Sequence, residues 1–185
     1  MNTATKNLED DHIYVLKLTD VMKILVNSEK GDVENVENII DIIRNFADGL
    51  HHAKEENLFF PALEKKGFSQ QQGPVAVMLN EHIQGRNYVK SMSDNLALLK
   101  NGNRDALTAI YQNMSAYADL LVSHIAKENN ILFRMADKSL SDTEQKELLT
   151  QFEAIELKRP AGSKMNDYID RINLLAQEYI FDKII

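Results

Sequence analysis

Apolar residues recur every three or four positions along four long stretches of this chain, the spacing that places side chains on one face of an α-helix. The clearest stripe runs through the second stretch, at Val36, Ile39, Ile40, Ile43, Phe46, Ala47 and Leu50. The pattern predicts helices over residues 8–26, 33–65, 74–99 and 104–136, with Pro61 bending or ending the second. Polar or glycine-containing segments near 27–32, 67–74 and 101–103 separate them. Because short turns join antiparallel neighbours, we predict an all-α fold: an antiparallel up-down-up-down four-helix bundle.

The pattern changes after residue 138. Ser141 to Glu144 form a capping-box sequence that opens a short helix ending near Ile155, and residues 159–163 interrupt it. A last amphipathic helix follows over residues 168–180. We therefore expect two parts, a bundle over residues 1–138 and a C-terminal helical extension over 139–185. The extension is expected to pack on the bundle, and the alternative is a homodimer interface through the C-terminal helix.

Composition supports helix over sheet and limits the chemistry. The 185 residues are enough for one domain with a sizeable core, and they include only seven Gly and three Pro. The absence of Cys excludes disulfides and thiolate-held metal sites, so any metal must be held by His and carboxylates.

Charge and hydropathy exclude several partners. The net charge is −7, the pI is about 5.2, and no basic run occurs, so neither nucleic acid nor an anionic membrane surface is an expected partner. No apolar run approaches the ~18 residues of a membrane helix, and the N-terminus lacks the apolar core of a signal peptide. We expect a cytoplasmic protein.

The most informative pattern is a ten-residue segment that is repeated. Residues 51–60 read HHAKEENLFF, and residues 124–133 read HIAKENNILF. Both copies place a His four residues before a Glu, at His51/Glu55 and His124/Glu128. Residues four apart lie on one helix face, so an imidazole and a carboxylate can reach one metal ion. Two such helices facing each other could hold a pair of ions between two carboxylates.

Chain geometry brings four of the five His to one level. His12 lies 16 residues before Ser28, and His51 lies 18 residues after Val33. At ~1.5 Å per residue, the helical segments between these two histidines and the turn are about 24 and 27 Å long. His82 and His124 lie at similarly matched distances from the turn that joins their helices. All four helices of the bundle are thus expected to present a His at one height.

Two registers are open on the second helix, because His52 and Glu56 share the spacing of His51 and Glu55. The apolar stripe and the repeat both favour the first pair. We expect His52 and Glu56 to face solvent or to support the ligands from outside. Glu81, beside His82, is also ambiguous and could support the ligands in the same way. The alternative, purely structural interpretation is a set of hydrogen-bonded core histidines. It leaves two buried carboxylates without the compensation that a cation would supply.

Over residues 8–136 the chain resembles the hemerythrin-like, or HHE cation-binding, family. The resemblance rests on His12 and on the segments HHAKEENLFFPAL, GPVAVMLNEHIQGR and HIAKE. It implies an antiparallel four-helix bundle that holds two iron ions bridged by oxo or hydroxo groups. By position, it implies terminal ligands at His12, His51, His82 and His124. It implies bridging carboxylates at Glu55 and Glu128. Nitrogen and carboxylate ligands also suit manganese and zinc.

The chain departs from the oxygen-carrying members of that family at two positions. They have a second His one turn after the first on the third helix, where this chain has Arg86. They also have an Asp five residues after the last His, where this chain has Asn129. The missing imidazole implies an open coordination position, which Arg86 could plug or gate. This ligand set is closer to the iron-binding, nitric-oxide-responsive and iron-sulfur-repair branch, although repair proteins often carry an N-terminal segment with Cys.

Three functions are consistent with such a site. The first is binding or sensing of iron or of a small diatomic ligand, oxygen or nitric oxide. The second is an oxidoreductase that removes nitric oxide or peroxide, and the third is a bundle that uses its metal only for stability. Whether the protein is an enzyme stays open at this point.

Overall fold

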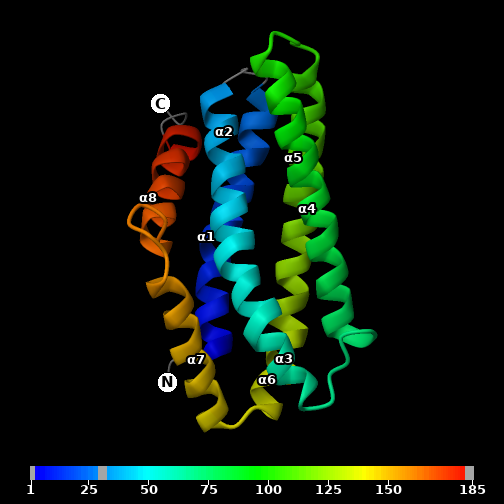
Figure 1. Ribbon diagram of the computed structural model, residues 1–185. Coiled ribbons are helices and arrows are strands. Elements are labelled where there is room, and N and C mark those ends of the chain that lie inside the picture. The colour runs from blue at the N-terminus through cyan, green and yellow to red at the C-terminus, as the bar shows by residue number, and fades with distance from the viewer. Residues whose placement is uncertain (1–2, 29–32, 182–185) are drawn as a thin grey trace.

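The structure is a computed structural model that describes residues 3–28 and 33–181, and its architecture confirms the predicted all-α bundle. Four long helical rods lie side by side in Figure 1. The first rod is α1 (Ala4–Ser28), and the third is α4 (Gly73–Lys100). Within the described ranges the chain forms no strand. The predicted turn at 27–32 falls mostly on residues 29–32, which lie outside those ranges.

The second and fourth rods are interrupted by wider π-helical turns. The second runs through α2 (Val33–Ile42), η1 (Ile43–His52), η2 (Glu55–Phe59) and α3 (Phe60–Glu64). The fourth runs through α5 (Ala106–Lys127), η3 (Glu128–Leu132) and α6 (Phe133–Ser139). Pro61 does not end its helix, because it lies in the first turn of α3, where a missing backbone N–H is tolerated.

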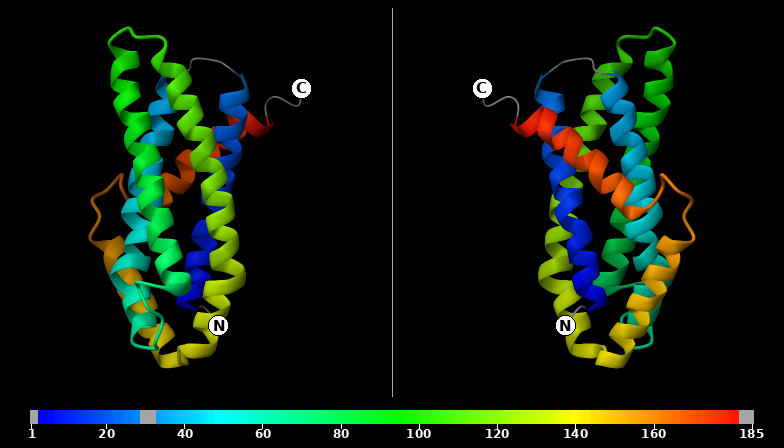
Figure 2. Two further views of the ribbon diagram at one scale, coloured as in Figure 1. Left: turned by 90° about the vertical axis from the view of Figure 1, so that its right-hand side faces the viewer. Right: turned by 90° about the vertical axis from the view of Figure 1, so that its left-hand side faces the viewer.

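The C-terminal extension forms two helices, α7 (Asp142–Leu157) and α8 (Met165–Ala176), and α8 continues into η4 (Gln177–Phe181). The capping box is present as predicted: the backbone N–H of Glu144 donates to Ser141 Oγ, and the Ser141 N–H donates to the Glu144 carboxylate. Figure 2 shows α8 crossing obliquely over α1 and α2, with α7 beside the other end of the bundle. The division at residue 138 and the homodimer both stay predictions.

Two apolar clusters fill the interior, and a polar layer lies between them along the chain. On α1, Leu8 belongs to one cluster and Val15 to the other, with His12 between them. On α4, Met78 and Val89 flank His82 in the same way. The extension contributes to both clusters, with Leu148 and Phe152 of α7 in one and Tyr168, Ile172 and Leu175 of α8 in the other. No helix among the described residues has the length and apolar character needed to cross a lipid bilayer.

Candidate metal centre

The six residues expected to bind metal all lie in the buried polar layer, and each is at most 2% exposed. Their nitrogen and oxygen atoms form two overlapping groups, each with all its atoms within 4.8 Å of one another. The first group contains His12, His51, Glu55 and Glu128. The second contains Glu55, His82 and His124, together with His52. Four rods and one shared carboxylate thus converge on two adjacent positions.

His52 is buried, so of the two positions expected for it the solvent-facing one is wrong. It is 5% exposed, and one of its ring nitrogens lies among those of His82 and His124. The reason lies in η1, which ends at His51 and His52. A π-turn bonds residue i to i+5 and holds more residues than an α-turn, so adjacent side chains diverge by a smaller angle. Both rings can therefore turn towards the interior, which an α-helical register of the sequence does not anticipate.

Both glutamates open a π-turn, and this is a structural counterpart of the sequence repeat. Glu55 is the first residue of η2, and its carbonyl accepts from the N–H of Phe60. Glu128 is the first residue of η3, and its carbonyl accepts from the N–H of Phe133. Single π-turns inside α-helices are frequent at functional sites. The two copies of the repeat thus present their carboxylates from the same local backbone geometry.

Each carboxylate lies between imidazoles of different helices. The Glu55 Oε2 atom is 3.6 Å from His51 Nε2 and 3.5 Å from His82 Nε2. The Glu128 Oε2 atom is 3.2 Å from both His12 Nε2 and His124 Nε2. Each glutamate therefore contacts one imidazole at each of the two positions. This is the arrangement that a bridging carboxylate would need.

The four oxygen atoms of these two glutamates are buried and make no hydrogen bond of acceptable geometry. Burying an uncompensated carboxylate costs several kcal/mol, so buried charges in proteins are normally paired or bind metal. Two such groups side by side, surrounded by imidazoles, are what a cation site offers when its own compensation comes from the cation. The residues present therefore fit a metal bound by nitrogen and oxygen ligands.

All five imidazoles share one hydrogen-bonding pattern: each Nδ1 faces an acceptor outside the centre. The acceptors are Asn129 for His12 at 2.7 Å, Asp11 for His51 at 3.2 Å, Asp48 for His52 at 3.3 Å, Glu56 for His82 at 2.7 Å and Glu81 for His124 at 3.0 Å. A neutral imidazole that donates from Nδ1 keeps the Nε2 lone pair free for a metal. Outer acceptors of this kind orient nearly all metal-binding histidines.

A cation supports most of these outer carboxylates, and the sequence repeat extends to two of them. Lys54, three residues after His51, donates to Asp11 at 3.1 Å. Lys127, three residues after His124, pairs with Glu81. The side chain of Lys54 is fully buried and also donates to Glu156 of α7 at 2.6 Å. The C-terminal extension thus contacts the metal centre through a chain of charged groups.

Arg86 neither plugs nor enters the centre. Its guanidinium donates to Asp48 at 2.8 Å from Nε and to Glu56 at 2.7 Å from one terminal nitrogen. These two carboxylates are the outer acceptors of His52 and His82. Arg86 therefore links two rings from two rods. Of the positions left open by the sequence, Glu56 lies against His82 and Glu81 lies against His124.

Burial favours the neutral form of three of the five imidazoles, those of His51, His52 and His82, by lowering their pKa. Burial lowers the pKa of His52 to about 3 and lowers that of His51 well below its ordinary value. Burial also opposes a charge on His124, but the Glu128 carboxylate outweighs this and raises its pKa to about 9. Burial and the adjacent Glu128 raise the pKa of Glu55 well above its ordinary value. The metal-free centre therefore holds protons at His124 and Glu55 that a cation would displace.

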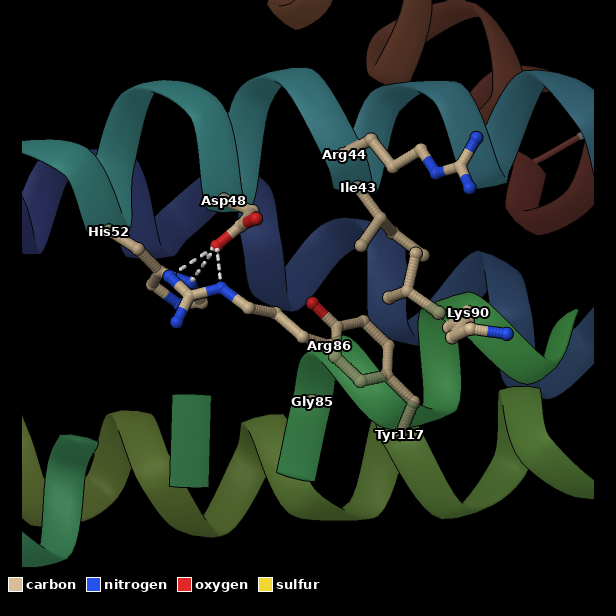
Figure 3. Close-up of a pocket in the computed structure, with 9 residues that line it drawn as sticks. Ile43, Arg44, Asp48, His52, Gly85, Arg86, Lys90 and Tyr117 are labelled. Atoms are coloured by element: carbon tan, nitrogen blue, oxygen red, sulfur yellow. Dashed lines mark hydrogen bonds and ion pairs between the residues drawn. The ribbon is translucent and has the colours of Figure 1, made fainter. Parts of the chain in front are cut away.

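A pocket of about 150 Å³ reaches the centre from one side of the bundle at His52. Figure 3 shows Asp48 and Arg86 joined across it, with Tyr117 at its wall and Gly85 on the helix below. A Cβ on Gly85 would come within 3.1 Å of the Tyr117 ring, so a larger residue there would narrow the pocket.

Comparisons with known proteins match this centre to one family. The sequence profile described as the hemerythrin HHE cation binding domain matches residues 3–136. The iron-sulfur cluster repair protein YtfE of Enterobacter sp. (strain 638) is 35% identical over 92 residues, which are 46% of this chain and 40% of that protein. YtfE of Escherichia coli O157:H7 is 32% identical over 88 residues, with the same two coverages, and YtfE of Edwardsiella ictaluri (strain 93-146) is 30% identical over 100 residues, 52% of this chain and 44% of that protein. The chain thus spans less than half the length of these relatives, and no solved structure matches it.

Proposed function

The chain belongs to the hemerythrin HHE cation-binding family, and from that premise we propose that it is a di-iron protein that binds or senses iron or a small diatomic ligand. The observation that carries the proposal is the pair of buried, unsatisfied carboxylates of Glu55 and Glu128 among imidazoles from four rods. Two overlapping groups of potential ligands support two ions rather than one. Manganese and zinc are accepted by the same ligand types, and iron is preferred through the family.

Each of the six candidate metal ligands has a distinct role in this proposal. His12 and His51 would hold one ion, His82 and His124 the other, and Glu55 and Glu128 would bridge them. Bound iron would supply redox chemistry and a Lewis-acidic centre for a diatomic ligand. The protein contributes neutral imidazoles oriented by outer acceptors, and apolar clusters on both sides that exclude water. The pocket beside Asp48 and Arg86 gives a small ligand a route to the centre.

The test is an anaerobic titration of the metal-free protein with Fe²⁺, followed by exposure to nitric oxide or oxygen. We expect about two irons per chain and new near-ultraviolet and visible bands after exposure. Glu55→Ala and His124→Ala should bind fewer than two equivalents tightly, because each removes a group from the convergent layer. Glu64→Ala is the matched control, since Glu64 lies on the second rod but is exposed and outside the layer.

The absorption spectrum then separates the two classes of function. Full return of the original spectrum when the gas is removed supports binding or sensing. Repeated consumption of nitric oxide or peroxide in the presence of a reductant would instead support the alternative, an oxidoreductase. Failure of the unaltered chain to bind iron, with wild-type helical content, would contradict the proposal.

A second candidate follows from the names of the relatives. Those proteins are named iron-sulfur cluster repair proteins, and their matches cover 46–52% of this chain. A role in supplying iron to damaged clusters would use the same centre with exchangeable iron. Transfer of iron from the loaded protein to an iron-depleted cluster protein, at a rate faster than free Fe²⁺ at equal concentration, would favour this role.

A further inference from the structure

We propose that His52 is a further metal ligand, so that the two ion positions are unequal: three imidazoles serve one and two serve the other. The inference rests on the proposed function and deepens it. The position with three imidazoles would be served by His52, His82 and His124. The position with two would be served by His12 and His51. This assignment replaces the interpretation in which the chain has one imidazole ligand fewer than the oxygen carriers because Arg86 stands in place of a His.

The first argument is that His52 has the same outer contact as the four other histidines. Its Nδ1 lies 3.3 Å from Asp48 Oδ1, and a carboxylate can only accept there. The neutral ring therefore offers its lone pair at Nε2. A histidine that served only to fill the core would not need an outer acceptor at Nδ1 of the kind that every expected histidine ligand has.

The second argument is the position of the ring inside the centre. A ring nitrogen of His52 lies within 4.8 Å of ligand atoms of Glu55, His82 and His124. The His52 ring lies face to face with the His82 ring, with centroids 3.8 Å and planes 18° apart, and 6.0 Å from the His124 ring. Because an imidazole lone pair lies in the ring plane, binding of one ion by His52 and His82 requires one of the two rings to rotate. His52 comes from the second rod, and its two partners come from the third and fourth. Three rods thus supply one imidazole each to a single position.

The third argument concerns Arg86, which we assign as a positioning residue for His52 and His82. Figure 3 shows its guanidinium beside Asp48 and His52, across the pocket between the second and third rods. Because Arg86 donates to both Asp48 and Glu56, it fixes the two acceptors that orient two neighbouring rings. Arg86, which stands where the oxygen carriers have a second imidazole on the third helix, thus holds the imidazole of His52 on the second helix in place.

The direct test counts bound imidazoles in the unaltered protein, so it does not depend on the folding of a variant. Proton NMR of the Co²⁺-loaded chain shows each metal-bound histidine as a strongly shifted ring N–H resonance that disappears in D₂O. We expect five such resonances, one for each Nδ1 held by an outer acceptor. Four resonances would overturn the assignment. Absence of any shifted resonance, with no Co²⁺ bound, would count against the proposed function instead.

Substitutions give a second, independent readout by competition of each ion with a chelator. In His52→Ala we expect one ion to bind at least ~10-fold more weakly and the other to keep its affinity. In Arg86→Gln we expect a loss of ~10-fold or more at the same position, as for other outer residues of metal sites. The matched control is Arg44→Gln, because Arg44 lines the same pocket but points away from Asp48 (Figure 3). Wild-type affinity at both positions in a folded His52→Ala variant would overturn the proposal.

Discussion

At the scale of single residues, the buried glutamates of the centre lower the stability of the metal-free fold. Glu55 and Glu128 are fully buried, and their oxygens have no hydrogen-bond partner. Replacing buried charged groups by apolar residues of similar volume often stabilises a protein by ~1–4 kcal/mol. A carboxyl group that contributed favourable contacts to the core would show the opposite behaviour, because the apolar replacement would lose those contacts. The sign of the stability change therefore separates a ligand from a core residue.

We predict that Glu55→Leu stabilises the metal-free protein by ~1–4 kcal/mol while abolishing tight binding of two ions. The reason is that leucine removes a buried carboxyl group without a hydrogen-bond partner and fills a similar volume. Urea unfolding of the metal-free variant and the metal-free parent, followed by circular dichroism, measures the change. Destabilisation by a similar amount would mean that Glu55 supports the core as a packing residue.

The same residues predict a pH dependence of the metal-free protein. The pKa of His124 is raised to about 9, so its contribution is complete below its unfolded value of 6.5 and is lost as pH rises through 9. Glu55 acts in the same direction. Its raised pKa means that the folded state binds a proton there more tightly than the unfolded state, and this stabilisation is lost as pH rises. Metal-free protein should therefore become less stable between pH 6.5 and 9.

Thermal unfolding with and without bound Mn²⁺ at pH 6.5, 7.5 and 8.5 checks this dependence. We expect the gap in midpoint between the loaded and metal-free forms to widen with pH, because metal binding displaces those protons. A gap that stays constant or narrows would show that His124 and Glu55 bind no displaceable protons in this range.

At the scale of elements, the helices could be predicted from the sequence, but the π-turns inside them could not. The stripe from Val36 to Leu50 located the second rod, and the repeat located Glu55 and Glu128 correctly in the interior. Periodicity assumes an α-helical turn, so it assigned His52 to the wrong side. Nothing local in the sequence marks the change of turn at Ile43.

Contacts between elements were also beyond the sequence. Asp11 directly precedes His12, yet its carboxylate serves His51 on another rod, and Asn129 serves His12 across the bundle. Such pairings need the relative rotation of two helices, which spacing along one helix does not fix. The repeated Lys three residues after each His was a usable signal, since both Lys54 and Lys127 support an outer carboxylate.

The link from α7 to this network gives an element-scale prediction. Lys54 is fully buried, and Glu156 of α7 is one of its three partners, together with Asn7 and Asp11. We predict that Glu156→Gln lowers stability by ~1–2 kcal/mol, because a hydrogen bond to a buried charged group is weakened. Urea unfolding measures the loss. The control Glu153→Gln, exposed on the same helix, should change stability by less than ~0.5 kcal/mol.

Equal effects of Glu156→Gln and Glu153→Gln would show that the contact of α7 with Lys54 contributes nothing to folding. A loss confined to Glu156→Gln would make the extension part of the support of the metal centre, because the same ammonium group holds the acceptor of His51.

At the scale of the whole molecule, two apolar clusters enclose a charged layer, and the extension packs into both. The antiparallel arrangement and the common height of His12, His51, His82 and His124 followed from helix lengths and turns alone. The docking of α7 and α8 required tertiary information, since an amphipathic face does not reveal which surface covers it. In this layer, two metal ions are proposed to lie between Glu55 and Glu128.

Anomalous scattering at the iron edge from crystals of the iron-loaded protein tests that claim most directly. We predict two anomalous peaks between the carboxylates, one beside His12 and His51 and the other beside His52, His82 and His124. A single peak, or peaks at the surface with an intact and metal-free layer, would contradict the account.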